Sequence, residues 1–149
     1  MKRLLIPLLL VSSFSVAAIE LPYQQLNGEQ KNISDHQGKW VVINYWATWC
    51  PPCLEEIPEL IHFHDNHKES DAVVLGFNME RVKRDKLVNF VDENMISYPI
   101  VPNAKSYEQI GDVPGLPTTY LIDPKGEVVA SQVGSITAEM LETFINKKR

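Results

Sequence analysis

The hydrophobic pattern of the chain alternates between short apolar runs and longer segments with helical periodicity. Residues 40–46 and 72–78 are nearly continuous runs of β-branched and aromatic residues, which is typical of buried strands. Each run is followed by a segment, 51–67 and 82–94, in which apolar residues recur at intervals of three and four, and this spacing predicts two helices. The order strand, helix, strand, helix indicates a parallel pair of strands joined by a right-handed crossover.

The second half of the pattern predicts shorter elements. Residues 98–101 form an extended piece, residues 105–110 a short helix and residues 118–123 a strand. A Pro-Lys-Gly turn follows, after which residues 128–133 are expected to pair antiparallel with 118–123. Thr137 is expected to cap a last helix. The predicted buried face of that helix consists of Met140, Leu141, Phe144 and Ile145.

The beginning of the pattern predicts a β-hairpin. Asn27-Gly28 is a strong two-residue turn signal between residues 23–26 and 30–33. With this hairpin, the elements describe an α/β protein in which a central mixed sheet is flanked by helices. Residues 19–149 contain no repeat, linker or low-complexity stretch, so we expect one domain there.

Residues 1–18 are patterned as a secretory signal peptide. A basic start, Met1-Lys2-Arg3, precedes an apolar core, and small residues end the stretch at Ala18. Cleavage after Ala18 predicts export to the periplasm, with an uncleaved inner-membrane anchor as the alternative. The whole chain has a formal net charge of −5, and without Lys2 and Arg3 the charge is −7. This acidic balance argues against nucleic-acid binding.

The two cysteines of the chain, Cys50 and Cys53, stand where the apolar run 40–46 gives way to a helix that starts with Pro51-Pro52. At a helix N-terminus, unpaired backbone N–H groups and the macrodipole stabilise the thiolate of Cys50. Cys53 lies one turn further on the same face, where it can attack a mixed disulfide on Cys50. The spacing therefore predicts a redox dithiol, with Cys50 as nucleophile and Cys53 as resolving thiol. A structural disulfide would close too short a loop to stabilise much, and a zinc site would need more ligands.

Three histidines on the predicted helix 51–67 raise the question of a metal. His62, His64 and His67 are more typical of a solvated helix face, because neighbouring positions on a helix point in different directions. We therefore expect neither a metal nor an organic cofactor.

Two separated motifs resemble those of the TlpA/ResA/DsbE-like periplasmic thiol-disulfide oxidoreductases, which are thioredoxin-superfamily proteins. The first motif comprises Gly38-Lys39, Asn44-Tyr45-Trp46-Ala47-Thr48-Trp49-Cys50-Pro51-Pro52-Cys53 and Glu56-x-Pro58-x-Leu60. The second is Gly115-Leu116-Pro117-Thr118-Thr119-Tyr120-Leu121-Ile122-Asp123. The resemblance implies that residues 19–149 form a thioredoxin-like domain.

The same resemblance implies roles for residues around the cysteines. Pro117 is expected to be cis, to face the cysteines and to shape substrate access, with Trp49, Pro51 and Pro52 completing the site. Glu80 matches a carboxylate that could shuttle the proton of Cys53, although its spacing is one residue shorter than in the family. A solvated Glu80 that opens the charged cluster Arg81 to Asp85 is the alternative.

One departure from the family is Leu54, which stands where an Arg or Lys is usual and so removes a cation near the thiols. The resemblance implies a monomeric protein-disulfide reductase, acting on substrates such as apocytochrome c and supplied with electrons by a membrane thiol carrier of the DsbD/CcdA type. A periplasmic dithiol oxidase is the main alternative. A copper metallochaperone of the Sco type would need CxxxC spacing and a C-terminal histidine, and no histidine follows His67.

Overall fold

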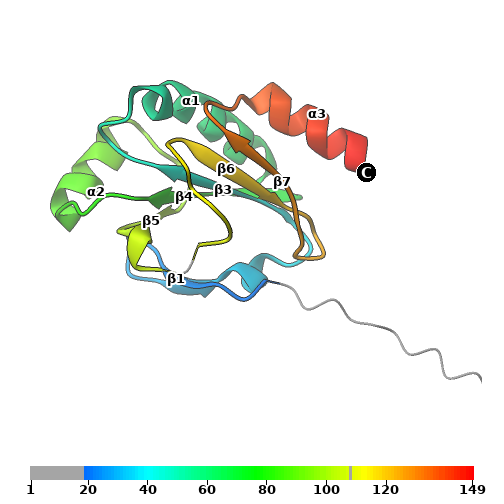
Figure 1. The fold of residues 1–149 in the computed structure, drawn as a ribbon, viewed down its shortest axis with the longest axis horizontal. Helices are drawn as coiled ribbons and strands as arrows, with labels where there is room; N and C mark the ends of the chain where they lie inside the picture. Colours follow the sequence, from blue (N-terminus) through cyan, green and yellow to red (C-terminus); the bar gives the residue numbers. More distant parts are fainter. Residues whose placement is uncertain (1–18, 108) are drawn as a thin grey trace, which may run out of the picture.

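The computed structural model describes residues 19–107 and 109–149, so the predicted signal peptide lies outside the described residues. The chain forms a five-stranded sheet, a separate two-stranded hairpin, three α-helices and two short 3₁₀ helices (Figure 1). In chain order the elements are β1 (Pro22–Gln24), β2 (Gln30–Asn32), η1 (Ile33–His36), β3 (Trp40–Trp46), α1 (Pro51–His67), β4 (Ala72–Asn78), α2 (Arg84–Glu93), β5 (Ile100–Val101), η2 (Ala104–Ser106), β6 (Thr118–Ile122), β7 (Val128–Val133) and α3 (Ala138–Lys148).

The five strands lie in the order β5-β4-β3-β6-β7, with β3 at the centre. β3 is parallel to β4 and antiparallel to β6, and β7 is antiparallel to β6. The predicted mixed sheet and N-terminal hairpin are both confirmed. Because β3 and β4 are parallel, their carboxyl ends meet at one edge of the sheet, the edge from which α1 and α2 begin.

The side chains of β3 divide the interior into two layers. Trp40, Val42 and Trp46 belong to the core cluster packed under the helices, whereas Val41 and Tyr45 belong to a second cluster under the hairpin. This is the period-two alternation of a strand that is buried on both faces. Apolar residues on both faces thus explain why the whole of β3 is buried.

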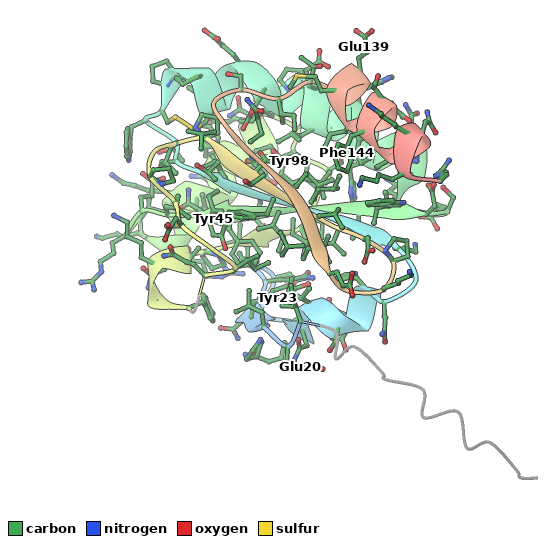
Figure 2. All side chains as sticks on the ribbon, turned by 45° about the vertical axis from the view of Figure 1, so that its right-hand side comes forward. Glu20, Tyr23, Tyr45, Tyr98, Glu139 and Phe144 are labelled. Carbon is green, nitrogen blue, oxygen red and sulfur yellow. A yellow bond between two sulfur atoms is a disulfide. The ribbon has the colours of Figure 1, made fainter. Side chains whose placement is uncertain are left out.

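Helices and hairpin cover opposite faces of the sheet. Figure 1 shows α1 and α3 above the sheet and β1 below it. In Figure 2, Tyr23 and Tyr45 lie on the hairpin side, whereas Tyr98 and Phe144 lie on the helix side, in agreement with the two core clusters. Among the described residues, no helix has both the length and the apolar character needed to cross a membrane.

Three local predictions are wrong. In place of the helix expected at 105–110, the described residues of this stretch form only a 3₁₀ turn, Ala104–Ser106. Met140 is exposed rather than part of the buried face of α3. His64 is buried rather than solvated, and its Nδ1 accepts a hydrogen bond from the backbone N–H of Val74 at 3.1 Å. β5 pairs only with Gly76 and Phe77, so His64 supplies the partner that a longer β5 would give to Val74.

Candidate active site

The centre of the site is a disulfide between Cys50 and Cys53, whose Cα atoms are 5.3 Å apart. Cys50 is the N-cap residue of α1, with extended φ and ψ angles of −94° and 104°. Both cysteines are buried in this oxidised form, at 3% and 1% exposure, whereas Trp49 beside them is 68% exposed. The structure therefore places Cys50 at a helix N-terminus, as the residue pattern predicts. The exposed side chain of Trp49 lies next to it in the chain.

The two prolines limit how strongly this helix end can stabilise a thiolate. Pro51 and Pro52 occupy the first two positions of α1 and have no N–H group to offer. The N–H of Leu54 is already bound to the carbonyl oxygen of Cys50 at 3.1 Å. Of the N–H groups in the first turn, that of Cys53 is the one left for the sulfur of Cys50.

Pro117 lies at the same end of the sheet as the disulfide. The Leu116–Pro117 peptide bond is cis, as the resemblance implied. Thr118, the next residue, begins β6 and pairs with Tyr45 near the carboxyl end of β3. The carbonyl oxygen of Pro117 accepts a hydrogen bond from the backbone N–H of Gly134 at 2.9 Å, which joins this loop to the end of β7.

A buried carboxyl group lies one helical turn beyond Cys53. Glu56 is only 2% exposed, and its Oε1 accepts a hydrogen bond from Nδ2 of Asn44 at 2.6 Å. Its Oε2 accepts the backbone N–H of Ile136 at 2.9 Å. Burial raises the pKa of Glu56 to about 7, and the hydrogen bonds from Ile136 and Asn44 act in the opposite direction. This carboxyl can therefore gain or lose a proton near neutral pH beside the redox pair.

Glu56 is the residue that sequence reasoning missed, since it was noted only as part of a motif. Two signals could have identified it. Glu56 follows Cys53 by three positions and so shares its helix face. Asn44 is the polar exception in the apolar run 40–46, and its place in the alternation of β3 puts it on the helix side of the sheet.

Glu80 lies against the loop that leads to the disulfide. Its Oε1 accepts hydrogen bonds from the backbone N–H of Thr48 and from Nδ2 of Asn78, both at 3.2 Å. Glu80 is half-buried and bound to this loop. Its action on the proton of Cys53 stays a prediction.

The three histidines of α1 have separate surroundings. His62 is exposed, His64 is buried, and His67 binds two carboxylates, with Nδ1 2.7 Å from Oδ1 of Asp71 and Nε2 2.5 Å from Oε1 of Glu142. Within residues 19–107 and 109–149, no group of three or more His, Cys, Asp or Glu side chains is placed to hold a metal ion.

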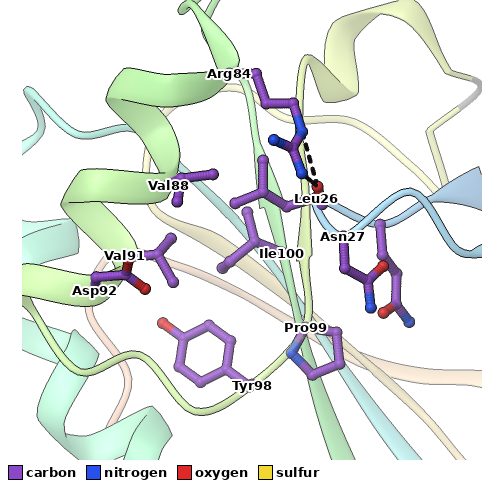
Figure 3. A pocket seen from close by; sticks show the side chains of 10 residues that line it. Leu26, Asn27, Arg84, Val88, Val91, Asp92, Tyr98, Pro99 and Ile100 are labelled. Atoms are coloured by element: carbon purple, nitrogen blue, oxygen red, sulfur yellow. Dashed lines mark hydrogen bonds between the residues drawn. The ribbon is translucent and has the colours of Figure 1, made fainter.

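A separate cavity of about 290 Å³ lies between the hairpin, α2 and the β5 edge (Figure 3). Apolar side chains such as Val88, Val91 and Ile100 line it. Arg84 spans one side, because its Nε and one terminal nitrogen donate to the carbonyl oxygen of Leu26 at 3.2 and 2.9 Å. This contact ties the start of α2 to the hairpin.

Comparison with known proteins connects this geometry to a redox chemistry. Residues 14–131 match the AhpC/TSA family. The chain is 32% identical over 124 residues to the thiol-disulfide oxidoreductase ResA of Bacillus subtilis (strain 168), a match that covers 83% of this chain and 69% of ResA. It is also 32% identical over 126 residues to the thioredoxin-like protein YneN of the same organism, covering 84% of this chain and 74% of YneN.

Solved structures agree with the fold. A DsbF homologue from Corynebacterium diphtheriae superposes with a TM-score of 0.75 at 27% identity, covering 88% of this chain and 86% of the other. A secreted thiol-disulfide isomerase from Corynebacterium glutamicum gives a TM-score of 0.73 at 28% identity, with 85% and 81% covered. With a disulfide at the start of α1 on a thioredoxin-like fold, the chain belongs to the AhpC/TSA family and is a thiol-disulfide oxidoreductase of the ResA-like group.

Proposed function

We propose that this oxidoreductase works outside the cytoplasm as a protein-disulfide reductase, with Cys50 as nucleophile and Cys53 as resolving thiol. The thiolate of Cys50 attacks a substrate disulfide, forms a mixed disulfide and releases one substrate thiolate. Cys53 then attacks the sulfur of Cys50, releases the second substrate thiolate and forms the Cys50–Cys53 disulfide seen in the structure. Two electrons pass to the substrate, which ends as a dithiol.

The observation that carries the reductase direction is the pair of prolines at the first two positions of α1, from which we infer that a thiolate at Cys50 is only weakly stabilised. A strong oxidant needs a strongly stabilised reduced form. Here Pro51 and Pro52 remove two N–H donors, and Leu54 places an apolar group where a cation would help. Glu56, when ionised, adds a negative charge behind Cys53 that opposes a second one on sulfur. All three features favour the disulfide form of the protein, which makes its dithiol a good electron donor.

The residues around the disulfide would assist the exchange. Trp49 offers an exposed apolar surface for a substrate segment, and Pro117 would shape the path along which that segment approaches. Glu80 would accept the proton of Cys53 and return it between cycles.

The proposed location and partners follow from the N-terminal pattern and the relatives. Residues 1–18 are patterned for export, and the Corynebacterium glutamicum neighbour is described as secreted. In an oxidising compartment a dithiol stays reduced only if electrons are delivered to it, so we propose a membrane thiol carrier of the DsbD/CcdA type as donor. Protein disulfides, including that of apocytochrome c, are the proposed acceptors.

A redox titration against glutathione tests the direction. We expect a potential near the value of about −270 mV for thioredoxin rather than the value of about −120 mV for DsbA. A potential close to the DsbA value would show that the protein is an oxidase and would overturn the proposal.

A further inference from the structure

Positive charge is concentrated in two short stretches of this acidic protein, one that follows Glu80 and one at the C-terminus, Lys147-Lys148-Arg149, where Arg149 is paired with Asp71. Four of the twelve Lys and Arg residues beyond position 18 form what we name the basic segment: Arg81, Lys83, Arg84 and Lys86. Once Glu80 and Asp85 are included, residues 80–86 carry a net charge of +2. The other residues of 19–149 carry −9, because the total for 19–149 is −7. The charge is therefore distributed unevenly along the chain.

The basic segment begins beside the redox centre. The carboxylate of Glu80, the residue just before the segment, accepts the backbone N–H of Thr48, two residues before Cys50. The backbone N–H of Met79 donates to the carbonyl oxygen of Trp46 at 2.9 Å. Figure 1 shows α2 beside the edge of the sheet where β3 and β4 finish. The loop that carries Trp49 and Cys50 and the loop that opens the basic segment are thus neighbours.

Three of the four cations are available to a partner. Arg84 is bound to the carbonyl oxygen of Leu26 and serves the fold. Arg81, Lys83 and Lys86 are exposed, and none of them forms an ion pair with another residue in the part of the chain that the structure describes.

We propose that the basic segment and Trp49 together form a docking surface for a partner protein that carries acidic side chains next to its reactive disulfide. This inference rests on the proposed function, for which it specifies the class of substrate. Residues 19–79 and 87–146 together carry a net charge of −12 and repel such a partner, whereas the other basic run, Lys147-Lys148-Arg149, lies at the end of α3, which is bound to Asp71. The charges of the basic segment therefore both speed the encounter and orient it toward Cys50. Trp49 supplies the apolar contact of the docked state.

A protein partner fits this surface better than an anionic membrane does. An interfacial helix needs an apolar face to insert into lipid. The apolar residues of α2 are used by the fold, since Leu87 is buried and Phe90 and Val91 pack on the main core. The basic segment therefore offers charge without an insertable face.

The test compares two cyclic peptides that differ only in charge. Each holds one intramolecular disulfide, flanked by four Asp residues in one peptide and four Lys residues in the other. The full-length protein, reduced with dithiothreitol and freed of it, is mixed in excess with each peptide, and formation of peptide dithiol is followed at increasing salt. We expect the acidic peptide to react about tenfold faster at low ionic strength. The advantage should vanish near 1 M salt, where the Debye length is about 3 Å.

Charge reversal locates the effect. In the variant Arg81→Glu/Lys83→Glu/Lys86→Glu, the ratio of the acidic to the basic rate constant should fall below one. This ratio cancels any general change in thiol reactivity. The control variant reverses three exposed lysines at the opposite end of the sheet, Lys125, Lys147 and Lys148. Two contacts place these lysines away from the disulfide. Lys125 follows the end of β6, which pairs with the start of β3 at Val41. The end of α3, which carries Lys147 and Lys148, is bound to Asp71, the residue before β4. The control should retain the preference for the acidic peptide.

The outcomes separate this inference from the function on which it rests. Equal rates for both peptides, or a preference that the control variant abolishes equally, overturn the docking surface. Binding to anionic lipid vesicles without any preference for the acidic peptide overturns it as well. Should the charge-reversed variant not fold, the salt dependence of the unmodified protein decides the matter alone. A reduced protein that reacts neither with the peptides nor with uncharged 2-hydroxyethyl disulfide contradicts the proposed function itself.

Discussion

The acidic side chains at the two ends of α1 lie in opposite environments. At its C-terminal end, His67 lies between the carboxylates of Asp71 and Glu142, and Arg149 forms a second ion pair with Asp71. The carboxylates of Asp71 and Glu142 there each have a basic partner. At its N-terminal end, the carboxyl of Glu56 is buried with neutral hydrogen-bond donors only, and burial raises its pKa to about 7.

This difference indicates which end of α1 can change its protonation during the redox reaction. A carboxyl group whose pKa is near neutrality can exchange a proton while the neighbouring sulfurs exchange electrons. A paired cluster resists such change, because removing one partner leaves the others uncompensated. The N-terminal end of α1 is therefore suited to proton exchange that accompanies the redox reaction. The C-terminal end has a structural role, because His67 joins α1 to Glu142 of α3 and to Asp71 before β4.

The largest expected effect comes from the disulfide itself. Cys50→Ser should reduce the exchange rate with a peptide disulfide to that of the uncatalysed reaction, because Cys50 stands at the N-cap of α1 whereas Cys53 lies inside the helix. Cys53→Ser should instead accumulate a mixed disulfide on Cys50, since the resolving thiol is missing. Mass spectrometry without reductant distinguishes the two adducts. Adducts that accumulate on Cys53 in Cys50→Ser would reverse the assigned roles.

A smaller effect, visible as a pH dependence of stability, is expected from Glu56. Its folded pKa of about 7 lies above the ordinary value of 4.5, so the folded protein holds this proton more tightly than the unfolded chain does. The contribution of Glu56 to stability is then fully present below about pH 4.5 and is lost as the pH rises to 7, by up to about 3 kcal/mol. Glu56→Gln should flatten this decline in urea unfolding of the oxidised protein.

The matched control for Glu56 is Glu59→Gln, one turn further along α1. The Oε2 of Glu59 accepts the backbone N–H of Ala138 at 3.0 Å, and Gln keeps one acceptor for it. This variant should show the same pH dependence as the unmodified protein. If both variants flatten the decline equally, the effect does not belong to the buried carboxyl, and the contrast between the ends of α1 is lost.

Local pattern was sufficient to predict the strands and the place of Cys50. The run 40–46 is apolar on both faces, and prolines follow Cys50 at the positions where a helix tolerates them, so neither inference needed distant residues. The thioredoxin-like fold followed from two separated motifs. Local pattern was not always sufficient, because it also predicted a helix at 105–110 and a buried Met140, and both predictions are wrong.

Predictions failed where a residue depends on a distant partner. The burial of His64 is linked to the shortness of β5, which pairs with β4 only at Gly76 and Phe77 and so leaves the N–H of Val74 to His64. The surroundings of Glu56 include Ile136, which is 80 residues away in the chain. Similarly, the charged cluster at 81–85 was recognised in the sequence, but its position beside the loop of Thr48 is a property of the folded chain.

Removing the paired cluster should change stability without changing the redox chemistry. His67→Ala breaks two hydrogen bonds to carboxylates, each worth about 1 kcal/mol or slightly more at a partly exposed site. We expect the free energy of unfolding to fall by about 2 kcal/mol in total, and Glu142→Gln to lose about half of that. The redox potential should stay the same in both variants. A shifted potential would show that the two ends of α1 are coupled.

The smallest expected effect is a gain in stability at Met95, which follows α2. Met95 has a positive φ of 52°, and the N–H groups of Met95 and Ile96 bind the carbonyl oxygens of Asp92 and Val91 as in a helix-terminating turn that favours glycine. Its side chain is 80% exposed, so Met95→Gly sacrifices little packing.

Relief of the Cβ strain at Met95 is worth about 1 kcal/mol, and the extra freedom of Gly in the unfolded chain offsets part of it. We expect a net gain of about 0.5 kcal/mol in urea unfolding, with an unchanged redox potential. Asn103→Gly is the matched control, because Asn103 has nearly the same φ of 53° but belongs to a residue type that tolerates this conformation. The gain at Asn103 should therefore be smaller than that at Met95. An equal or larger gain at Asn103 would mean that the strain at Met95 is already compensated by contacts of its side chain.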